Sequence, residues 1–254
     1  MKVIIMKRNI IEIFSSIQGE GKYVGARQAF VRLAGCNLNC KYCDTDFKPQ
    51  KVCKVEKCAG SGDIVEYEND MEIDTLIKIL DGYLNKTPHH SVSFTGGEPL
   101  LSAEFIKEAA KKISVPIFLE TNGTLYDELS NIIDSVDIIS MDLKLESGAG
   151  KNLFEAHKKF LSVAKNKDLY VKIILAEQTN SEEIEEAASL AKDADRDIMF
   201  VIQPVTPYGG MSAPSLRKIF DAEETVLKYL RNVRWCRRRT ECWGYCDFRN
   251  CMNI

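Results

Sequence analysis

Short apolar runs alternate along this chain with longer segments whose apolar residues recur at helical spacing. The short runs predict buried strands, and the periodic segments predict amphipathic helices. The expected strands are 10–14, 29–34, 92–94, 116–119, 136–139, 170–175 and 198–202, and the expected helices are 73–84, 105–113, 125–133, 153–164, 182–194 and 216–230. Strands that alternate with helices form right-handed crossovers and a parallel sheet. Counted from the run at 29–34, the pattern predicts an α/β fold with six β/α units. A single domain over residues 1–254 can hold them, because α/β barrels of this length routinely form one unit.

Two segments depart from this alternation. Residues 46–70 are polar, rich in Lys and Gly, and include Cys53 and Cys58, which predicts an inserted loop that is functional or mobile. Residues 231–254 form a tail rich in Cys and Arg, without the apolar periodicity of packed elements.

The tail allows three hypotheses. Its cysteines could build an auxiliary cluster or zinc site, alone or with Cys53 and Cys58. A late change of reading frame, which the missing periodicity favours, would leave a tail without evolved structure. Basic contacts to transfer RNA are the third, since the tail carries the necessary charge. The tail cysteines are Cys236, Cys242, Cys246 and Cys251.

Composition narrows the class of protein. The formal net charge of −3 points neither to nucleic acid nor to an anionic membrane. Nine cysteines, an odd number without a secretory signal, favour metal binding in a reducing cytosol over disulfides. No apolar run approaches the ~18 residues of a membrane span. We expect a soluble cytoplasmic protein with no membrane partner, and the composition does not favour a nucleic-acid partner.

Three cysteines, Cys36, Cys40 and Cys43, follow the run at 29–34 with the spacing C-x3-C-x2-C. Thiolates on one short loop can hold three irons of a cuboidal iron–sulfur cluster, and the missing fourth cysteine leaves one iron open. A zinc ion would need a fourth ligand nearby, and no His lies within forty residues. Plain buried cysteines are the third interpretation.

Polar motifs follow the other expected strands, at 95–99, 120–123, 140–144 and 203–204. In parallel β/α folds the carboxyl ends of the strands share one face, which carries the active site. The segment 18–21, two glycines around a glutamate, precedes the cysteine loop by one strand. Taken alone, such a segment is more often a plain surface turn, and its position beside the cysteine loop is what raises its value. The shared location favours an enzyme over a simple cluster-binding protein.

The cysteine loop, with Tyr42 before its last cysteine, resembles that of the radical S-adenosylmethionine (SAM) superfamily, and 95–99 resembles its glycine-rich motif. The resemblance implies a partial (β/α)6 barrel. It implies a 4Fe-4S cluster on Cys36, Cys40 and Cys43, whose open iron binds SAM and whose electron cleaves SAM to methionine and a 5′-deoxyadenosyl radical. The residues it implies for cofactor binding are Tyr42, Cys43, Asp44, Gly96, Gly97, Glu98, Ser140, Lys144 and Gln203. The spacing from Ser140 to Lys144 is longer than is usual.

Within this superfamily, segments 11–47, 95–99, 120–124 and 203–204 resemble the 7-carboxy-7-deazaguanine synthase family. The resemblance implies a lyase that converts 6-carboxy-5,6,7,8-tetrahydropterin into 7-carboxy-7-deazaguanine, with release of ammonia, for queuosine and archaeosine. It also implies regeneration of SAM, an electron donor such as flavodoxin or ferredoxin, and a homodimer.

The family's substrate residues map onto this chain. Glu20 is suited to accept hydrogen bonds from the N–H edge of a pterin, and the fork of Arg32 is suited to the substrate carboxylate. Together with the three cysteines these two form the expected catalytic set. Thr45 corresponds to a magnesium ligand, in keeping with the preference of Mg²⁺ for oxygen. The remaining expected pterin contacts are Ile17, Gln18, Gly19 and Thr95.

Two other functions stay open from the residues. A glycyl-radical-enzyme activase would use the same cluster and SAM on a protein substrate, but would not be expected to carry the segment 18–21 or Arg32 as a small-molecule pocket. A non-enzymatic iron–sulfur or zinc-binding protein is the alternative of another class. His157 lies on an apolar helix face and is expected to be a packed core residue. We assign His89 and His90 no catalytic role.

Overall fold

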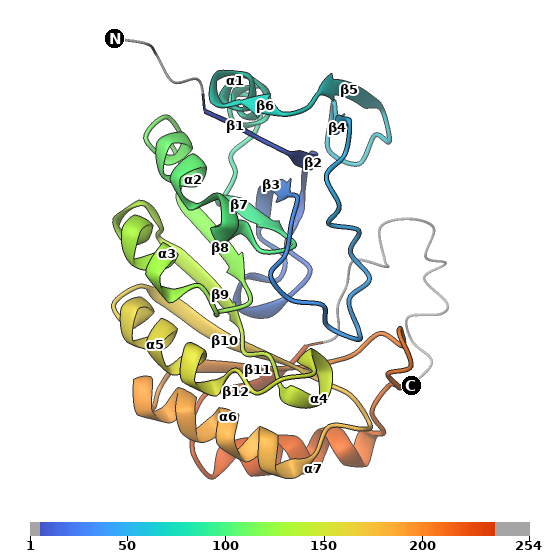
Figure 1. Cartoon of the computed structure of the whole chain (residues 1–254), viewed down its shortest axis with the longest axis vertical. Helices are drawn as coiled ribbons and strands as arrows, with labels where there is room; N and C mark the ends of the chain where they lie inside the picture. The colour runs from blue at the N-terminus through green and yellow to red at the C-terminus, as the bar shows by residue number, and fades with distance from the viewer. Residues whose placement is uncertain (1–5, 237–254) are drawn as a thin grey trace.

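A ten-stranded sheet runs through the part of the chain that the computed structural model describes, residues 6–236 (Figure 1). Its strand order is β12-β11-β10-β9-β8-β7-β3-β2-β4-β5. The parallel strands are β3 (Arg27–Leu33), β7 (Ser91–Gly96), β8 (Ile117–Thr121), β9 (Ile138–Asp142), β10 (Asp168–Leu175), β11 (Met199–Pro204) and β12 (Val233–Trp235). Strand β2 (Ile10–Ile17) runs antiparallel to β3.

Within residues 6–236, six longer helices alternate with the parallel strands and cover one side of the sheet (Figure 1). They are α1 (Ile73–Leu84), α2 (Ala103–Ala110), α3 (Tyr126–Ile132), α5 (Phe154–Ala164), α6 (Ser181–Ala194) and α7 (Leu216–Leu227). The short elements are β1 (Lys7–Arg8), paired with β6 (Met71–Glu72), the helix α4 (Glu146–Ala149) and the 3-10 turns Gly21–Tyr23, Pro99–Ser102 and Ile133–Ser135. The prediction of an α/β fold with six β/α units is confirmed.

Different groups of buried side chains pack on the two faces of the sheet. The helix-covered face carries the main apolar core, whereas Phe118, Ile138, Tyr170 and Val201 form a separate buried cluster. Each of these four lies in the first half of its strand. Side chains two residues further along a strand point to the same face. The positions that follow this cluster are therefore directed into the concave side of the sheet, toward the carboxyl ends of the strands.

Residues 46–70 are not the loop that the composition predicts. They contain an antiparallel hairpin of β4 (Val52–Glu56) and β5 (Ile64–Glu68), which extends the sheet through parallel pairing of β4 with β2. Cys53 and Val55 are buried in β4 while Lys54 points outward. Two buried positions among lysines were too short an alternation to predict a strand.

The first residues of the tail also differ from the expectation. Strand β12 pairs in parallel with β11, and the backbone N–H of Cys236 donates to the carbonyl of Ile202. The first residues of the tail thus extend the sheet, and the hypothesis of a late change of reading frame stays a prediction for the residues that follow. Cys242, Cys246 and Cys251 lie outside the described residues.

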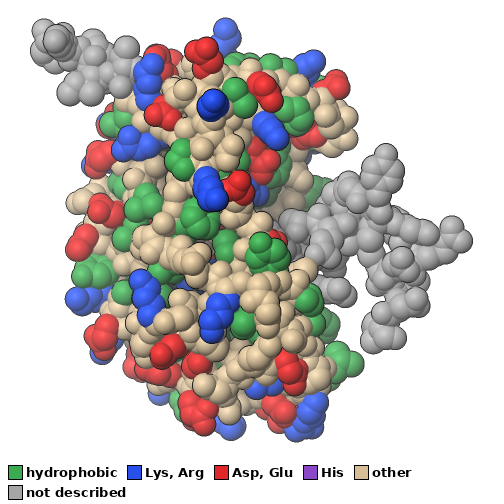
Figure 2. Space-filling model, turned by 45° about the vertical axis from the view of Figure 1, so that its right-hand side comes forward, with side chains coloured by type: hydrophobic (Ala, Val, Ile, Leu, Met, Phe, Trp, Pro, Cys, Tyr) green, Lys and Arg blue, Asp and Glu red, His purple; other side chains and the backbone are tan. Residues whose placement is uncertain are grey.

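The surface carries charges of both signs. On the face drawn in Figure 2, lysine and arginine side chains are interspersed with aspartate and glutamate over the described elements. Across residues 6–236 no helix combines the length and apolar character needed to cross a bilayer.

Burial makes the two cysteines of the hairpin unequal, which gives a testable prediction. Cys53 is fully buried, and burial raises the pKa of its thiol to about 12, whereas Cys58 is exposed. Replacing Cys53 with Ser places a more polar hydroxyl in the apolar core, where the thiol contacts the Lys54 carbonyl only at 3.9 Å, so we expect urea unfolding to show a loss of about 1–3 kcal/mol. The matched change Cys58→Ser should stay within about 0.5 kcal/mol of the parent. Both variants should keep the parent's iron and zinc content; metal lost from Cys53→Ser would restore this residue as an auxiliary ligand.

Candidate active site

A cavity opens at the carboxyl ends of the parallel strands and gathers nearly all the residues singled out from the sequence. Its walls come from β2, β3, β7 to β11 and the loops that follow these strands. The expected residues that line it are Ile17, Gln18, Gly19, Glu20, Arg32, Cys36, Cys40, Tyr42, Cys43, Asp44, Thr45, Thr95, Gly96, Gly97, Ser140, Lys144 and Gln203. Segments as far apart as 17–20 and 203 therefore share one site.

The cysteine loop forms one wall. Cys36, Cys40 and Cys43 all line the cavity, each partly buried and none in a disulfide. Burial raises the pKa of Cys36 and Cys40. Among residues 6–236 no three His, Cys, Asp or Glu side chains converge as ligands of a single metal ion. Three thiols around one hollow instead fit a cluster, in which each sulfur binds a different iron.

The glycine motif packs directly against this loop. A Cβ atom added to Gly97 would lie 2.0 Å from the carbonyl oxygen of Gly35 and 2.9 Å from Cβ of Cys36. The N–H of Glu98 donates to the same Gly35 carbonyl at 2.8 Å. Glycine at 97 is therefore required for the approach of the two loops, and the space beside Cys36 is a cradle with no side chain in it.

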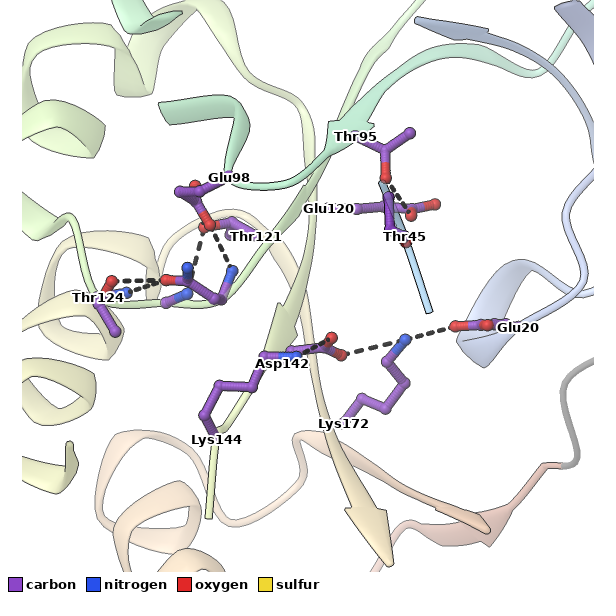
Figure 3. Close-up of polar contacts among 12 residues, drawn as sticks. Glu20, Thr45, Thr95, Glu98, Glu120, Thr121, Thr124, Asp142, Lys144 and Lys172 are labelled. Carbon is purple, nitrogen blue, oxygen red and sulfur yellow. Dashed lines mark hydrogen bonds and ion pairs between the residues drawn. The ribbon is translucent and has the colours of Figure 1, made fainter. Parts of the chain in front are cut away.

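Glu98, expected to bind the cofactor, does not line the cavity. Its side chain is fully buried, and its carboxylate accepts hydrogen bonds from Leu100 N (3.0 Å), Thr121 Oγ1 (2.8 Å) and Asn122 N (2.7 Å). Burial raises its pKa to about 7. Asn122 in turn donates to Asn37 Oδ1 of the cysteine loop at 2.8 Å. Glu98 thus braces the loops behind the site (Figure 3).

The loop after β2 is fixed by a buried glutamine. Gln18 Nε2 donates to Glu120 Oε1 at 2.8 Å and to Gln28 Oε1 at 3.0 Å, while its Oε1 accepts from the N–H of Glu20 at 3.1 Å. Thr95 Oγ1 donates to the other oxygen of Glu120 at 2.9 Å (Figure 3). This network sets the direction in which Glu20 leaves the strand.

Arg32 lies opposite, on β3. Its Nε donates to Glu12 Oε1 at 2.6 Å, across the β2–β3 pairing in which these two residues face each other. The terminal nitrogens of its guanidinium make no hydrogen bond to another described residue, and the side chain lines the cavity. Glu12 therefore orients the guanidinium of Arg32, and the terminal nitrogens of this group can bind an anion.

Sequence reasoning missed three charged residues of the site, namely Glu120, Asp142 and Lys172. Lys172 Nζ lies 2.5 Å from Glu20 Oε2 and 3.1 Å from Asp142 Oδ1, and Asp142 Oδ2 accepts from Lys144 Nζ at 2.8 Å (Figure 3). Burial alone would raise the pKa of Asp142, but the two lysines outweigh it and hold this pKa at about 2. Burial alone would lower the pKa of Lys172, but the carboxylates of Asp142 and Glu20 raise it. The sequence did contain a signal for Lys172, which is a charged residue inside the apolar run 170–175. A charge within an apolar run was also the signal that singled out Arg32.

Gln203 and His157 are two further buried side chains that the sequence singled out. The side-chain oxygen of Gln203 is buried without a hydrogen-bond partner in the described residues, although it lines the cavity. A ligand donor at this point would satisfy it. His157 is fully buried, its pKa lowered to about 4 by burial, so the prediction of a packed histidine is confirmed.

Comparison with known proteins identifies the family. Residues 31–149 match the radical SAM superfamily. A 7-carboxy-7-deazaguanine synthase of Geobacter sulfurreducens is 37% identical over 229 residues, which cover 88% of this chain and 92% of that protein. Another from Methanocaldococcus jannaschii is 41% identical over 240 residues, covering 88% and 93%. The chain belongs to the 7-carboxy-7-deazaguanine synthase family.

Solved structures support the fold. QueE from Escherichia coli superposes with a TM-score of 0.56 at 20% identity, covering 91% of this chain and 94% of that one. A radical SAM methyltransferase of Sphaerobacter thermophilus gives 0.53 at 12% identity, covering 89% and 77%. The arrangement of strands and helices described above is thus that of radical SAM proteins.

Proposed function

We propose that this protein is a radical SAM carbon–nitrogen lyase that converts 6-carboxy-5,6,7,8-tetrahydropterin into 7-carboxy-7-deazaguanine and ammonia, in the 7-deazapurine route to queuosine and archaeosine. The observation that carries the proposal is one cavity that joins the three-thiol wall to a carboxylate, Glu20, and a guanidinium, Arg32. Such a cavity suits a small molecule that has both N–H donors and an anionic group. A protein substrate, as an activase would need, does not require this pair.

The cofactor side is formed by the cysteine loop and the strand ends facing it. Cys36, Cys40 and Cys43 would hold the 4Fe-4S cluster. When bound, the cluster and SAM supply the one-electron cleavage that makes hydrogen abstraction from the pterin possible. The chain's own part is to hold SAM in place, and the residues on the cavity wall proposed for this are Tyr42, Asp44, Gly96, Gly97, Ser140, Lys144 and Gln203. Glu98 acts indirectly, through the loops.

The substrate side is formed by β2, β3 and β7. Glu20 accepts from the N–H edge of the pterin, and Arg32 donates to its carboxylate. Phe14 and Phe30 stack with ring centroids 5.0 Å apart and line the same cavity, where they exclude water from one side of the pterin. Ile17, Gln18, Gly19 and Thr95 complete the contacts. Thr45 offers a hydroxyl on the wall to a Mg²⁺ ion, which takes its other oxygens from substrate and water.

The reaction also needs a reductant. We propose flavodoxin or ferredoxin as the donor, in the cytoplasm, where reduced thiols persist. A homodimer is the family's arrangement and is part of the proposal.

Turnover tests the proposal directly. Anaerobic, cluster-reconstituted protein given SAM, Mg²⁺, reductant and carboxytetrahydropterin should release 7-carboxy-7-deazaguanine, detected by mass spectrometry, together with one ammonia per product. Cys40→Ala should give none, because a cluster ligand is lost, while Cys58→Ala should match the parent. SAM cleavage without deazaguanine in the parent protein would leave radical SAM chemistry and exclude this substrate.

A further inference from the structure

Four charged side chains form a continuous row across the cavity, in the order Glu20, Lys172, Asp142, Lys144. The contacts are 2.5 Å, 3.1 Å and 2.8 Å between nitrogen and oxygen. The row starts at the residue proposed for the pterin edge and ends at a lysine proposed for SAM. It therefore joins the two halves of the site (Figure 3).

The side chains of the row are largely shielded from water, which strengthens the attraction between their charges. The side chains of Lys172 and Lys144 are 9% and 13% exposed, and those of Glu20 and Asp142 are 18% and 24% exposed. Ion pairs shielded from water are screened much less than surface pairs. The two charges of each sign balance within the row. The contact between Lys172 and Asp142 is an ion pair without a hydrogen bond, because Asp142 Oδ1 is buried and accepts none from the described residues.

Each of the two inner residues, Lys172 and Asp142, has two partners of opposite charge. The two partners of each residue therefore compete for it. Lys172 is shared between two carboxylates, and Asp142 between two lysines. A donor that binds Glu20 draws its carboxylate away from Lys172, and Lys172 then pairs more strongly with Asp142. Asp142 in turn holds Lys144 less tightly. Lys144 becomes free to donate to an oxygen of SAM.

We infer that Lys172 is a positioning residue that aims Glu20 at the pterin and, through Asp142, couples pterin binding to SAM binding. The inference rests on the proposed function, because it takes the pterin as the donor at Glu20. Its sign is fixed by the order of charges: pterin and SAM each tighten the binding of the other. Coupling free energies between sites correspond to about 5–150-fold changes in affinity, and we expect about tenfold here.

The first experiment replaces Lys172. SAM dissociation constants are measured by equilibrium dialysis on reconstituted protein with an oxidised cluster, so that SAM is not cleaved, with and without carboxytetrahydropterin. In Lys172→Met, Asp142 pairs with Lys144 alone, so SAM should bind several-fold more weakly and the pterin should no longer change its affinity. The KM for pterin should rise more than kcat falls. Lys172→Arg keeps the charge between the carboxylates and should restore much of the coupling.

The second experiment replaces the other end of the row. In Glu20→Gln the charged competitor for Lys172 is absent, so SAM should bind several-fold more tightly than in the parent without any pterin. The two variants should therefore shift SAM affinity in opposite directions. General damage to the cavity would weaken SAM binding in both.

The outcomes separate this inference from the proposed function. Parent protein that neither binds nor converts the pterin overturns both. Parent protein that turns the pterin over, with Lys172→Met weakening pterin and SAM alike but keeping their coupling, overturns the positioning role alone. Unchanged or weaker SAM binding in Glu20→Gln also overturns the positioning role of Lys172. This test does not depend on whether a Lys172 variant folds.

Discussion

Replacing Gly97 with Ala should abolish loading of the iron–sulfur cluster. The added methyl carbon would sit 2.0 Å from the Gly35 carbonyl oxygen, and backbone atoms cannot rotate away as a side chain can. The cysteine loop must then move off the glycine motif, breaking the 2.8 Å hydrogen bond from Glu98 N to Gly35 and displacing Cys36. Overpacking of this kind costs about 1–3 kcal/mol in a core, and here the strain falls on Cys36, a proposed cluster ligand.

Iron and sulfide analysis after anaerobic reconstitution measures this effect. We expect iron in Gly97→Ala to fall close to zero, with far-ultraviolet circular dichroism like that of the parent. Gly82→Ala is the matched control, because Gly82 lies in α1 with no atom within 4 Å of an added Cβ. It should load fully and gain about 1 kcal/mol from helix propensity. Four irons per chain in Gly97→Ala would contradict the claim that cluster loading requires the close approach of Gly97 to the cysteine loop.

Replacing Glu20 with Ala should remove pterin turnover while leaving the cluster intact. Glu20 is the carboxylate proposed for the pterin edge, and it is the partner of the buried Lys172 at 2.5 Å. Truncating one member of a buried, hydrogen-bonded charge pair costs about 2–5 kcal/mol. We therefore expect kcat/KM for the pterin to fall by about 30-fold to about 5,000-fold, since 1.36 kcal/mol is a factor of ten.

Product formation and iron content are measured on the same preparation. Glu186→Ala is a suitable control, since Glu186 is exposed on α6, away from the cavity, and should leave turnover unchanged. A Glu20→Ala protein that loses its iron would place Glu20 in the support of the cysteine loop. A variant with normal turnover would remove Glu20 from the substrate contacts.

Local pattern determined a large part of this protein. The order of strands and helices follows from apolar spacing, because each element must bury one face. The convergence of the motifs around Cys36, Gly97 and Gln203 follows from the fold class, since parallel strands end on a common face. The C-x3-C-x2-C spacing places three thiols on one short loop without help from distant residues. These inferences needed only neighbours in sequence.

The contacts between distant strands were decided by the tertiary structure. Glu98 and Gly97 are adjacent in one motif, yet the carboxylate of Glu98 turns behind the loops while Gly97 faces Cys36. Lys172 acquires its role only because the curvature of the sheet brings β10 against Glu20, 152 residues earlier. The hairpin at 52–68 became a sheet extension only by pairing with β2. Sequence periodicity records which face of an element is buried, but the partner a buried polar group meets depends on strand register and curvature, and these are properties of the packed sheet.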